Sequence, residues 1–173
     1  MCEHHAPEKF SRRAFAGLAA GAAGLALMPL RAQASGAIEA MGVTCIDYRL
    51  VDDAVKFFAK LGLTDEYDTL SLAGASLAAV SPKFPKANAA FWDQLAISKD
   101  LHHITKVIFV DHRDCGAYKV AFGDKFVGEP PAAETAQHKT VMEAAKTALT
   151  QMHPDLKAEF YLMALDGTAE RIL

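Results

Sequence analysis

Cysteine and histidine residues suited to metal binding lie in two short segments of the sequence. Cys45 lies in the first segment, and His112 and Cys115 lie in the second. Thiolate and imidazole are ligands that Zn²⁺ prefers, and two intervening residues let a tight turn bring His112 and Cys115 to one ion. Three protein ligands leave the fourth tetrahedral position free for water, as in catalytic rather than structural sites. The sequence therefore predicts one zinc ion per chain, held by Cys45, His112 and Cys115.

Asp47 and Arg49 follow Cys45 closely and are candidates for an acid/base dyad. Two thiolates neutralise the charge of Zn²⁺, so this site should acidify its bound water less than a site of three histidines. Asp47 could accept a hydrogen bond from the zinc-bound hydroxide, while Arg49 holds the carboxylate ionised through a forked ion pair. Alternatively, Asp47 ligates the metal directly and closes the site. Exchange between these two states would give a pH-dependent switch.

The N-terminal segment resembles a twin-arginine export signal. Arg12 and Arg13 precede an uncharged stretch rich in alanine, glycine and leucine, and Ala32 and Ala34 give the small-x-small pattern that signal peptidase cuts. We expect residues 1–34 to be a signal peptide, cleaved after Ala34, and the protein to be periplasmic. A permanent transmembrane helix is the less favoured alternative, because the stretch is broken by glycine and shorter than the about 20 residues that span a bilayer.

Composition limits the rest of the chain to one globular domain. The sequence has 173 residues, of which 51% are hydrophobic and 23% are charged, which is enough apolar material for a core. Cleavage of the leader would take the formal charge from −3 to −5, through loss of four basic and two acidic residues: Lys9, Arg12, Arg13, Arg31, Glu3 and Glu8. Without a basic surface, nucleic acid and membrane surfaces are poor partners.

Two cysteines in an oxidising compartment could instead form a disulfide. Cys2 lies in the expected leader, which leaves Cys45 and Cys115 for such a bond. A structural disulfide has no need of a histidine three residues before one cysteine, or of Asp47 and Arg49 beside the other. The pattern favours a metal site.

Hydrophobic patterns predict alternating strands and helices. A nearly all-apolar run such as residues 106–110 is typical of a strand buried on both faces of a parallel sheet. The sequence thus predicts an α/β fold, with a mostly parallel β-sheet flanked by helices and sites at the carboxyl ends of strands. We expect strands at 40–44, 69–73, 106–110 and 160–165, the last closed by a turn at Asp166-Gly167, helices at 51–61, around 91–97 and around 141–152, and breaks at 81–85 and 128–131.

The two motifs resemble those of the β-class carbonic anhydrases. These enzymes carry Cys-x-Asp-x-Arg at the end of the first strand and His-x-x-Cys-Gly at the end of a later one, as in residues 45–49 and 112–116. The resemblance extends from Ala40 to the C-terminus, through Leu72-Ala73-Gly74, His103-Ile104 and Asp166-Gly167. It implies a single β-carbonic anhydrase-like α/β domain over residues 35–173.

The resemblance also implies an activity. This family hydrates CO2 reversibly to bicarbonate by attack of zinc-bound hydroxide, and then exports a proton. Carried over residue by residue, Cys45, His112 and Cys115 would bind zinc, and Asp47 and Arg49 would form the dyad. The family habit of completing its pocket from two subunits implies a homodimer with CO2 and bicarbonate as its small-molecule partners.

The chain also departs from the family pattern. Tyr48 replaces the usual serine or threonine, and Ser71 and Leu72 replace an Arg-Asn pair. After cleavage of the expected leader, only a few residues would precede the first strand, where many relatives carry a helical arm. Tyr48 could line the pocket or simply pack. We expect His102, His138 and His153 at the surface or at helix ends, with one of them a candidate proton shuttle. The aromatic residues expected in the core or a subunit interface are Phe57, Phe58, Phe91 and Trp92.

Two alternatives from other classes remain open on the sequence. One is a related zinc hydrolase that acts on a CO2 analogue such as carbonyl sulfide or carbon disulfide, with the same ligands. The other is a zinc-binding or redox protein without turnover, with either a Cys45–Cys115 disulfide or a metal blocked by Asp47.

Overall fold

The computed structural model describes residues 36–123 and 131–173, and residues 35–173 form one compact unit. The expected leader at 1–34 and most of the break at 128–131 lie outside the described residues. Within the described part, no helix is both long and apolar enough to cross a membrane.

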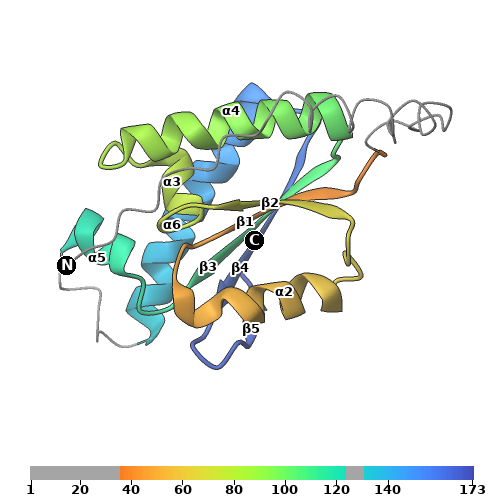
Figure 1. Ribbon diagram of the computed structural model, residues 1–173. Coiled ribbons are helices and arrows are strands. Elements are labelled where there is room, and N and C mark those ends of the chain that lie inside the picture. Colours follow the sequence, from red (N-terminus) through yellow and green to blue (C-terminus); the bar gives the residue numbers. More distant parts are fainter. Residues whose placement is uncertain (1–35, 124–130) are drawn as a thin grey trace, which may run out of the picture. The chain divides into compact units, whose positions relative to one another are not determined.

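The fold is built on a five-stranded sheet in the order β2-β1-β3-β4-β5 (Figure 1). The first four strands pair in parallel, and β5 pairs antiparallel with β4. This topology confirms the predicted α/β class with a mostly parallel sheet. The strands are β1 (Ala40–Thr44), β2 (Tyr67–Ser71), β3 (Lys106–His112), β4 (Lys157–Met163) and β5 (Ala169–Arg171).

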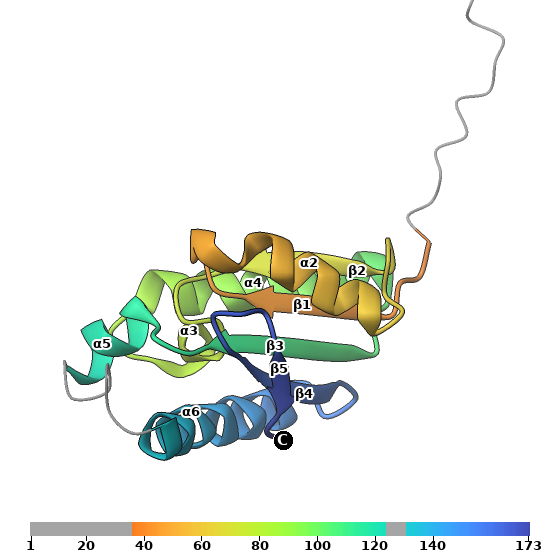
Figure 2. The same cartoon turned by 90° about the horizontal axis from the view of Figure 1, so that it is seen from below.

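Helices cover both faces of this sheet. α2 packs on one face, whereas α3, α4 and α6 pack on the other, as the two views show (Figures 1 and 2). A short 3-10 helix leads into α2, and α5 follows β3 directly. The helices are η2 (Tyr48–Leu50), α2 (Val51–Lys60), α3 (Ser76–Val80), α4 (Pro85–His102), α5 (Gly116–Phe122) and α6 (Pro131–Met152).

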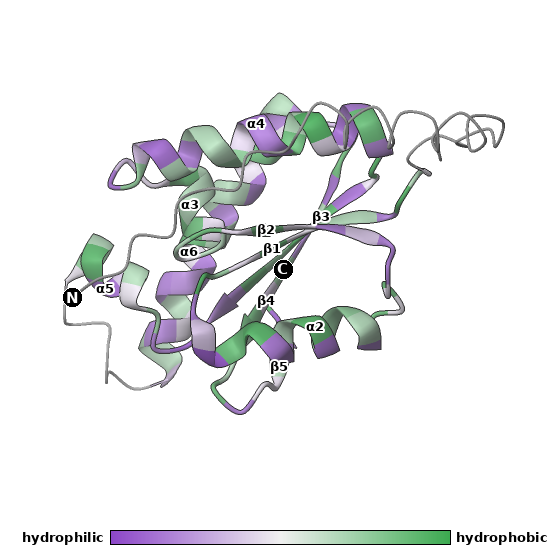
Figure 3. Ribbon diagram, viewed as in Figure 1, coloured by the Kyte–Doolittle hydropathy of each residue, from purple (hydrophilic) through white to green (hydrophobic). Residues whose placement is uncertain are grey.

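β3 lies at the centre and contributes to both hydrophobic cores. Val107 and Phe109 pack toward α4 and α6, while Ile108 and Val110 pack toward α2. This alternation is the period of two that a strand imposes on its side chains. α2 carries both apolar and polar residues, as expected for a helix that packs one face on the sheet and exposes the other (Figure 3). A strand buried on both faces therefore holds its end rigidly, and that end carries His112.

Several predicted boundaries agree with the structure and two do not. The strand at 40–44 and the helix that ends before Gly62 are confirmed. The strand expected at 69–73 begins and ends two residues earlier, because Tyr67 stacks on Phe58 and Asp68 is used inside the strand to bond Ser98 and His102. Asp68, a polar residue inside β2, interrupts the pattern of apolar residues from which the strand was predicted.

The prediction that 160–165 is the last strand is wrong. β4 begins at Lys157 and ends at Met163, and β5 follows it across the turn that contains Gly167. β5 has the sequence Ala-Glu-Arg, which carries no apolar pattern, and exists through its pairing with β4. The short helices α3 and α5 were not expected either.

Candidate functional site

The candidate metal ligands meet at the carboxyl edge of the sheet. Cys45 follows β1 directly, His112 is the last residue of β3, and Cys115 immediately precedes α5. Because β1 and β3 are parallel neighbours, their ends lie at the same edge. One ligand atom from each of Cys45, His112 and Cys115 lies within 4.8 Å of the others. The structure therefore brings together three residues that the sequence singled out, in a group able to hold a metal ion.

The two sulfur atoms are arranged as ligands rather than as a disulfide. Cys45 and Cys115 are free cysteines, and their Sγ atoms lie 3.9 Å apart. A disulfide requires about 2.05 Å. Two thiolates on a tetrahedral zinc ion, each about 2.3 Å from the metal, lie about 3.8 Å apart. The observed separation fits a shared metal.

The ring of His112 is oriented for coordination through Nε2. Its Nδ1–H donates a hydrogen bond of 2.8 Å to the carbonyl oxygen of Arg113, which leaves the lone pair on Nε2. His112 is 2% exposed, and its Nε2 is buried without a hydrogen-bond partner among the described residues. A buried nitrogen without a partner is costly. A metal ion between this nitrogen and the two sulfurs would remove that cost.

The surroundings of Cys45 favour a thiolate. The backbone N–H of Gly74 donates to Sγ of Cys45 at 3.3 Å. The hydrogen bond from Cys115 holds the pKa of the Cys45 thiol well below its usual range, and the Cys45 thiolate in turn raises the pKa of Cys115. Two adjacent thiolates need a cation, because a coordinating thiol is deprotonated outright. The donor set therefore suits a divalent metal.

Asp47 and Arg49 form a forked ion pair beside these ligands. Nε and one terminal nitrogen of Arg49 donate to the two carboxylate oxygens of Asp47 at 3.0 and 2.8 Å. The hydrogen bond with Arg49 lowers the pKa of Asp47 to about 2, so the carboxylate is ionised at neutral pH. One of its oxygens lies 3.8 Å from Nε2 of His112. The carboxylate is close enough to reach a group bound at the ligands.

A protein-family model with the description "Putative carbonic anhydrase" matches residues 37–164 of this chain. The chain belongs to this carbonic anhydrase family. Two relatives are uncharacterized proteins of Rickettsia conorii and Rickettsia bellii. Each is 38% identical over 130 residues, which cover 75% of this chain and 69% and 79% of the respective relatives.

The fold of this chain is similar to that of solved β-carbonic anhydrase structures. A carbonic anhydrase from Streptococcus mutans has a TM-score of 0.54 at 17% identity, covering 96% of this chain and 100% of that one. A Coccomyxa β-carbonic anhydrase solved with acetazolamide has a TM-score of 0.51 at 12% identity, covering 92% and 82%. At these low identities the similarity concerns the fold alone. The convergence of Cys45, His112 and Cys115 is observed in this carbonic anhydrase family member itself and does not depend on the comparison.

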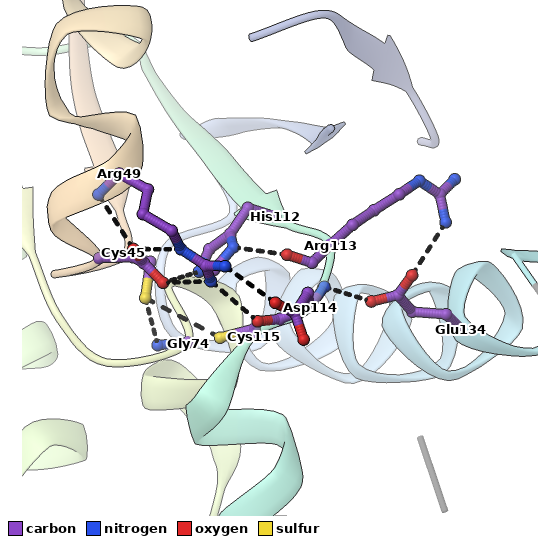
Figure 4. A network of polar contacts seen from close by, with 9 residues as sticks. Cys45, Arg49, Gly74, His112, Arg113, Asp114, Cys115 and Glu134 are labelled. Carbon is purple, nitrogen blue, oxygen red and sulfur yellow. Dashed lines mark hydrogen bonds and ion pairs between the residues drawn. The ribbon is translucent and has the colours of Figure 1, made fainter. Parts of the chain in front are cut away.

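A second contact of Arg49 ties the two motifs together. Its other terminal nitrogen donates to the carboxylate of Asp114 at 2.8 Å. Asp114 adopts a left-handed φ of 55°, and its backbone N–H donates to Glu134 of α6 at 2.6 Å (Figure 4). Glu134 also pairs with Arg113. The turn between His112 and Cys115 is thus held from both sides, which a strained backbone position requires.

Sequence reasoning missed Asp114 and Glu134. Asp114 lies inside the His-x-x-Cys motif, but its role depends on a left-handed φ that the motif does not reveal. Glu134 lies 20 residues further along the chain, at the start of α6. Only the fold places it against the turn.

Two cavities adjoin Cys45. The first, which we term the α2 cavity, has a volume of about 210 Å³ and is lined by His112 and by apolar residues such as Phe58 and Val110. The second, the α5 cavity, has about 290 Å³ and is lined by Asp47, Phe84 and Val120. Tyr48 lines neither cavity and is 86% exposed, so neither reading suggested for it agrees with the structure.

None of the other three candidate histidines, His102, His138 and His153, lines either cavity. His102 accepts a backbone hydrogen bond from Ile38, which precedes β1, and His153 accepts one from Leu156, which precedes β4. Both therefore lie at the amino edge of the sheet. His138 is 1% exposed within α6, so the prediction that it lies at the surface or at a helix end is wrong. Its Nδ1 bonds the buried carboxylate of Asp111, a partner that the sequence did not suggest.

Proposed function

We propose that this protein is a zinc-dependent carbonic anhydrase that catalyses the reversible hydration of CO2 to bicarbonate. The observation that carries the proposal is the convergence of Cys45, His112 and Cys115 within 4.8 Å of one another, together with the buried Nε2 of His112, which has no hydrogen-bond partner among the described residues. Membership of the carbonic anhydrase family supports it.

The proposed roles follow from the chemistry of the side chains. Cys45, His112 and Cys115 would hold the zinc ion, which supplies Lewis acidity and makes a water molecule beside it easier to deprotonate. Asp47 is ionised, so its carboxylate can only accept hydrogen bonds. It orients the attacking water by accepting a hydrogen bond from it. Arg49 keeps that carboxylate charged and fixes its direction through the fork.

The surroundings suit a small apolar substrate. The α2 cavity is lined largely by apolar side chains, including Leu50, Phe58 and Met163. CO2 carries no net charge and needs no ion pair to enter such a space. The released proton passes to solvent at the dyad, where the side chain of Arg49 is 32% exposed, because His102 and His153 lie at the amino edge of the sheet and His138 is buried.

The apolar lining also favours a second candidate function. Carbonyl sulfide and carbon disulfide are linear and less polar than bicarbonate, and the same three ligands would serve their hydrolysis. The competing proposal is therefore a zinc hydrolase of a CO2 analogue. Substrate profiling separates the two.

The test combines metal analysis with kinetics on the full chain. We expect about one zinc per chain and CO2 hydration in a stopped-flow assay, and both should be lost in Cys45→Ala. Cys2→Ala in the full chain is the matched control and should keep both. Zinc binding with hydrolysis of carbonyl sulfide but no CO2 hydration would replace the proposal by the second candidate. Absence of bound zinc would contradict both.

We also propose a homodimer. Apolar side chains are exposed near the candidate site, with Ile46 at 63% and Val120 at 69% exposure, and an apolar surface of this kind favours association. Light scattering should give twice the chain mass. A monomer at micromolar concentration would contradict this part of the proposal.

A further inference from the structure

A buried carboxylate lies directly behind the candidate metal ligands. Asp111 is the residue before His112 on β3 and is 1% exposed. Burying a carboxylate is costly unless its oxygens are satisfied by hydrogen bonds. The proposed reaction has no direct use for Asp111, because its side chain points into the interior and contacts neither sulfur.

Four donors from three helices converge on this carboxylate. Ser76 of α3 donates its backbone N–H at 2.9 Å and its hydroxyl at 2.7 Å. Tyr118 of α5 donates its hydroxyl at 2.6 Å, and Nδ1 of His138 on α6 donates at 3.0 Å. Ser76, Tyr118 and His138 are themselves buried, at 0%, 3% and 1% exposure. Asp111 therefore joins β3 to α3, α5 and α6 at one point.

The contact with Ser76 holds the turn that bonds Cys45. Gly74 has a φ of +83° and Ala75 has a φ of +46°. A left-handed residue with a side chain persists only where its surroundings hold it. Ser76 follows this pair, and its two hydrogen bonds to Asp111 fix the turn in the conformation that directs the N–H of Gly74 at Sγ of Cys45.

The contact with Tyr118 acts on the other sulfur. Cys115 is the residue directly before α5, so the backbone N–H groups of Ala117 and Tyr118 in the first turn of that helix lie beside its sulfur. The side chain of Tyr118 extends from the same residue to Asp111, so this hydrogen bond fixes the rotation of the first turn of α5. The ring of His138 packs on Tyr118 with centroids 3.9 Å apart and holds it from α6.

We propose that Asp111 is a positioning residue of the metal centre: through Ser76, Tyr118 and His138 it fixes the turn whose Gly74 N–H bonds Cys45 and the start of α5 that follows Cys115, and so sets the affinity of the site for zinc. This inference rests on the proposed zinc site. Mutation of residues that hydrogen-bond the ligands of a metal typically changes metal affinity by about 10- to 100-fold.

Two conservative variants test the inference without removing the carboxylate. Tyr118→Phe and Ser76→Ala each remove one hydroxyl that donates to Asp111. Tyr161→Phe and Ser98→Ala are matched controls, because each removes a hydroxyl that donates to a carboxylate elsewhere, Glu159 and Asp68 respectively. Zinc affinity is measured by competition with a chromophoric chelator. The Co²⁺-loaded proteins are compared by their visible absorption, which reports ligand geometry.

We expect Tyr118→Phe and Ser76→Ala to weaken zinc binding by about 10-fold or more and to shift the Co²⁺ absorption bands, while the two controls match the wild type. Urea unfolding of the zinc-free proteins separates the loss of zinc affinity from a loss of stability. If the hydroxyl groups only stabilised the fold, variants and controls would both lose stability, and the Co²⁺ spectrum would stay unchanged. Equal zinc affinity and equal spectra in variants and controls would overturn the inference.

The outcome is independent of the assay for the proposed function. A wild type that binds zinc but does not hydrate CO2 would refute the proposed reaction and leave the affinity comparison intact. A wild type that binds neither zinc nor Co²⁺ would refute both. Asp111→Asn is a further variant in which one acceptor oxygen becomes a donor, and it should weaken zinc binding more than either hydroxyl deletion.

Discussion

Arg49 is the residue that links the two motifs of the candidate site. It holds Asp47 through a fork and Asp114 through its remaining nitrogen. Because a lysine ammonium cannot form this planar fork, Arg49→Lys should leave Asp47 free to rotate. We expect CO2 hydration to fall by at least about 10-fold while zinc content stays unchanged, as measured by stopped-flow kinetics and metal analysis.

The control for this substitution is Arg171→Lys. Arg171 lies on β5 and is paired more loosely, with its nitrogen 3.9 Å from Glu159. Its replacement should leave the rate at the wild-type value. Equal rates for the Arg49 and Arg171 variants would refute a role for the fork in the reaction.

Gly74 offers a second test at the scale of one residue. A Cβ at this position would lie 3.0 Å from Leu77 and 3.2 Å from Ala117, at a φ of +83°. Gly74→Ala should therefore combine left-handed strain with overpacking and lower the free energy of unfolding by about 2–4 kcal/mol. Urea denaturation of the zinc-free protein measures this.

Gly62→Ala isolates the backbone contribution. Gly62 has a similar φ of +79°, but a Cβ there would meet no atom within 4 Å. Its replacement should cost only about 1 kcal/mol. If the two variants lost the same stability, the close packing of Gly74 against α3 and α5 would not be a constraint.

The candidate ligands could be predicted from residue types, whereas the residues around them could not. Cysteine and histidine residues at this spacing are recognisable as metal ligands from the sequence, and the structure brings Cys45, His112 and Cys115 together. Asp111 and Glu134 carry no such pattern. An isolated acidic residue in a sequence looks solvated, and only the packing of α6 against β3 reveals its partners.

At the scale of elements, apolar runs and an amphipathic helix could be predicted, whereas short helices could not. β1 and β3 have the expected starts because each is a run of apolar residues, and α2 because its apolar residues repeat at helical spacing. The elements that hold the sulfurs, α3 and α5, have five and seven residues, too few to show a period. They form because the backbone turns sharply after Gly74 and Cys115.

The packing of α2 on the sheet depends on a glycine in β1. A Cβ on Gly42 would lie 2.6 Å from the ring of Phe58 and 2.9 Å from that of Tyr67. Two stacked rings cannot yield easily, so Gly42→Ala should lower the free energy of unfolding by about 1–3 kcal/mol in urea. Gly36→Ala is the control, since a Cβ there meets nothing within 4 Å. Equal stabilities would show that α2 can shift away from the sheet.

At the scale of the whole molecule, the site lies at one edge of the sheet and is assembled from both halves of the chain. β1 brings Cys45, and β3 brings His112. These strands are neighbours only because the chain crosses over to β2 and returns, so the site depends on the complete topology. A protein exported by the twin-arginine route crosses the membrane folded, which suits a site of this kind.

Export is itself testable. Arg12→Lys combined with Arg13→Lys should leave the protein in the cytoplasm of a bacterial host that has a twin-arginine pathway, because that pathway reads the arginine pair. The wild type should appear in the periplasmic fraction, with a mass that corresponds to cleavage after Ala34. Arg31→Lys is the matched control and should be exported. Periplasmic recovery of the double variant would contradict the proposed signal.

In the proposed metal centre, two sulfurs and one imidazole hold zinc and leave a coordination position open. Zinc K-edge X-ray absorption on the purified, zinc-loaded protein measures this directly. We predict two sulfur ligands at about 2.3 Å and two lighter ligands at about 2.0 Å, one from His112 and one from solvent, with one sulfur lost in Cys115→Ser. A zinc shell without sulfur, or one that Cys115→Ser leaves unchanged, would contradict the account.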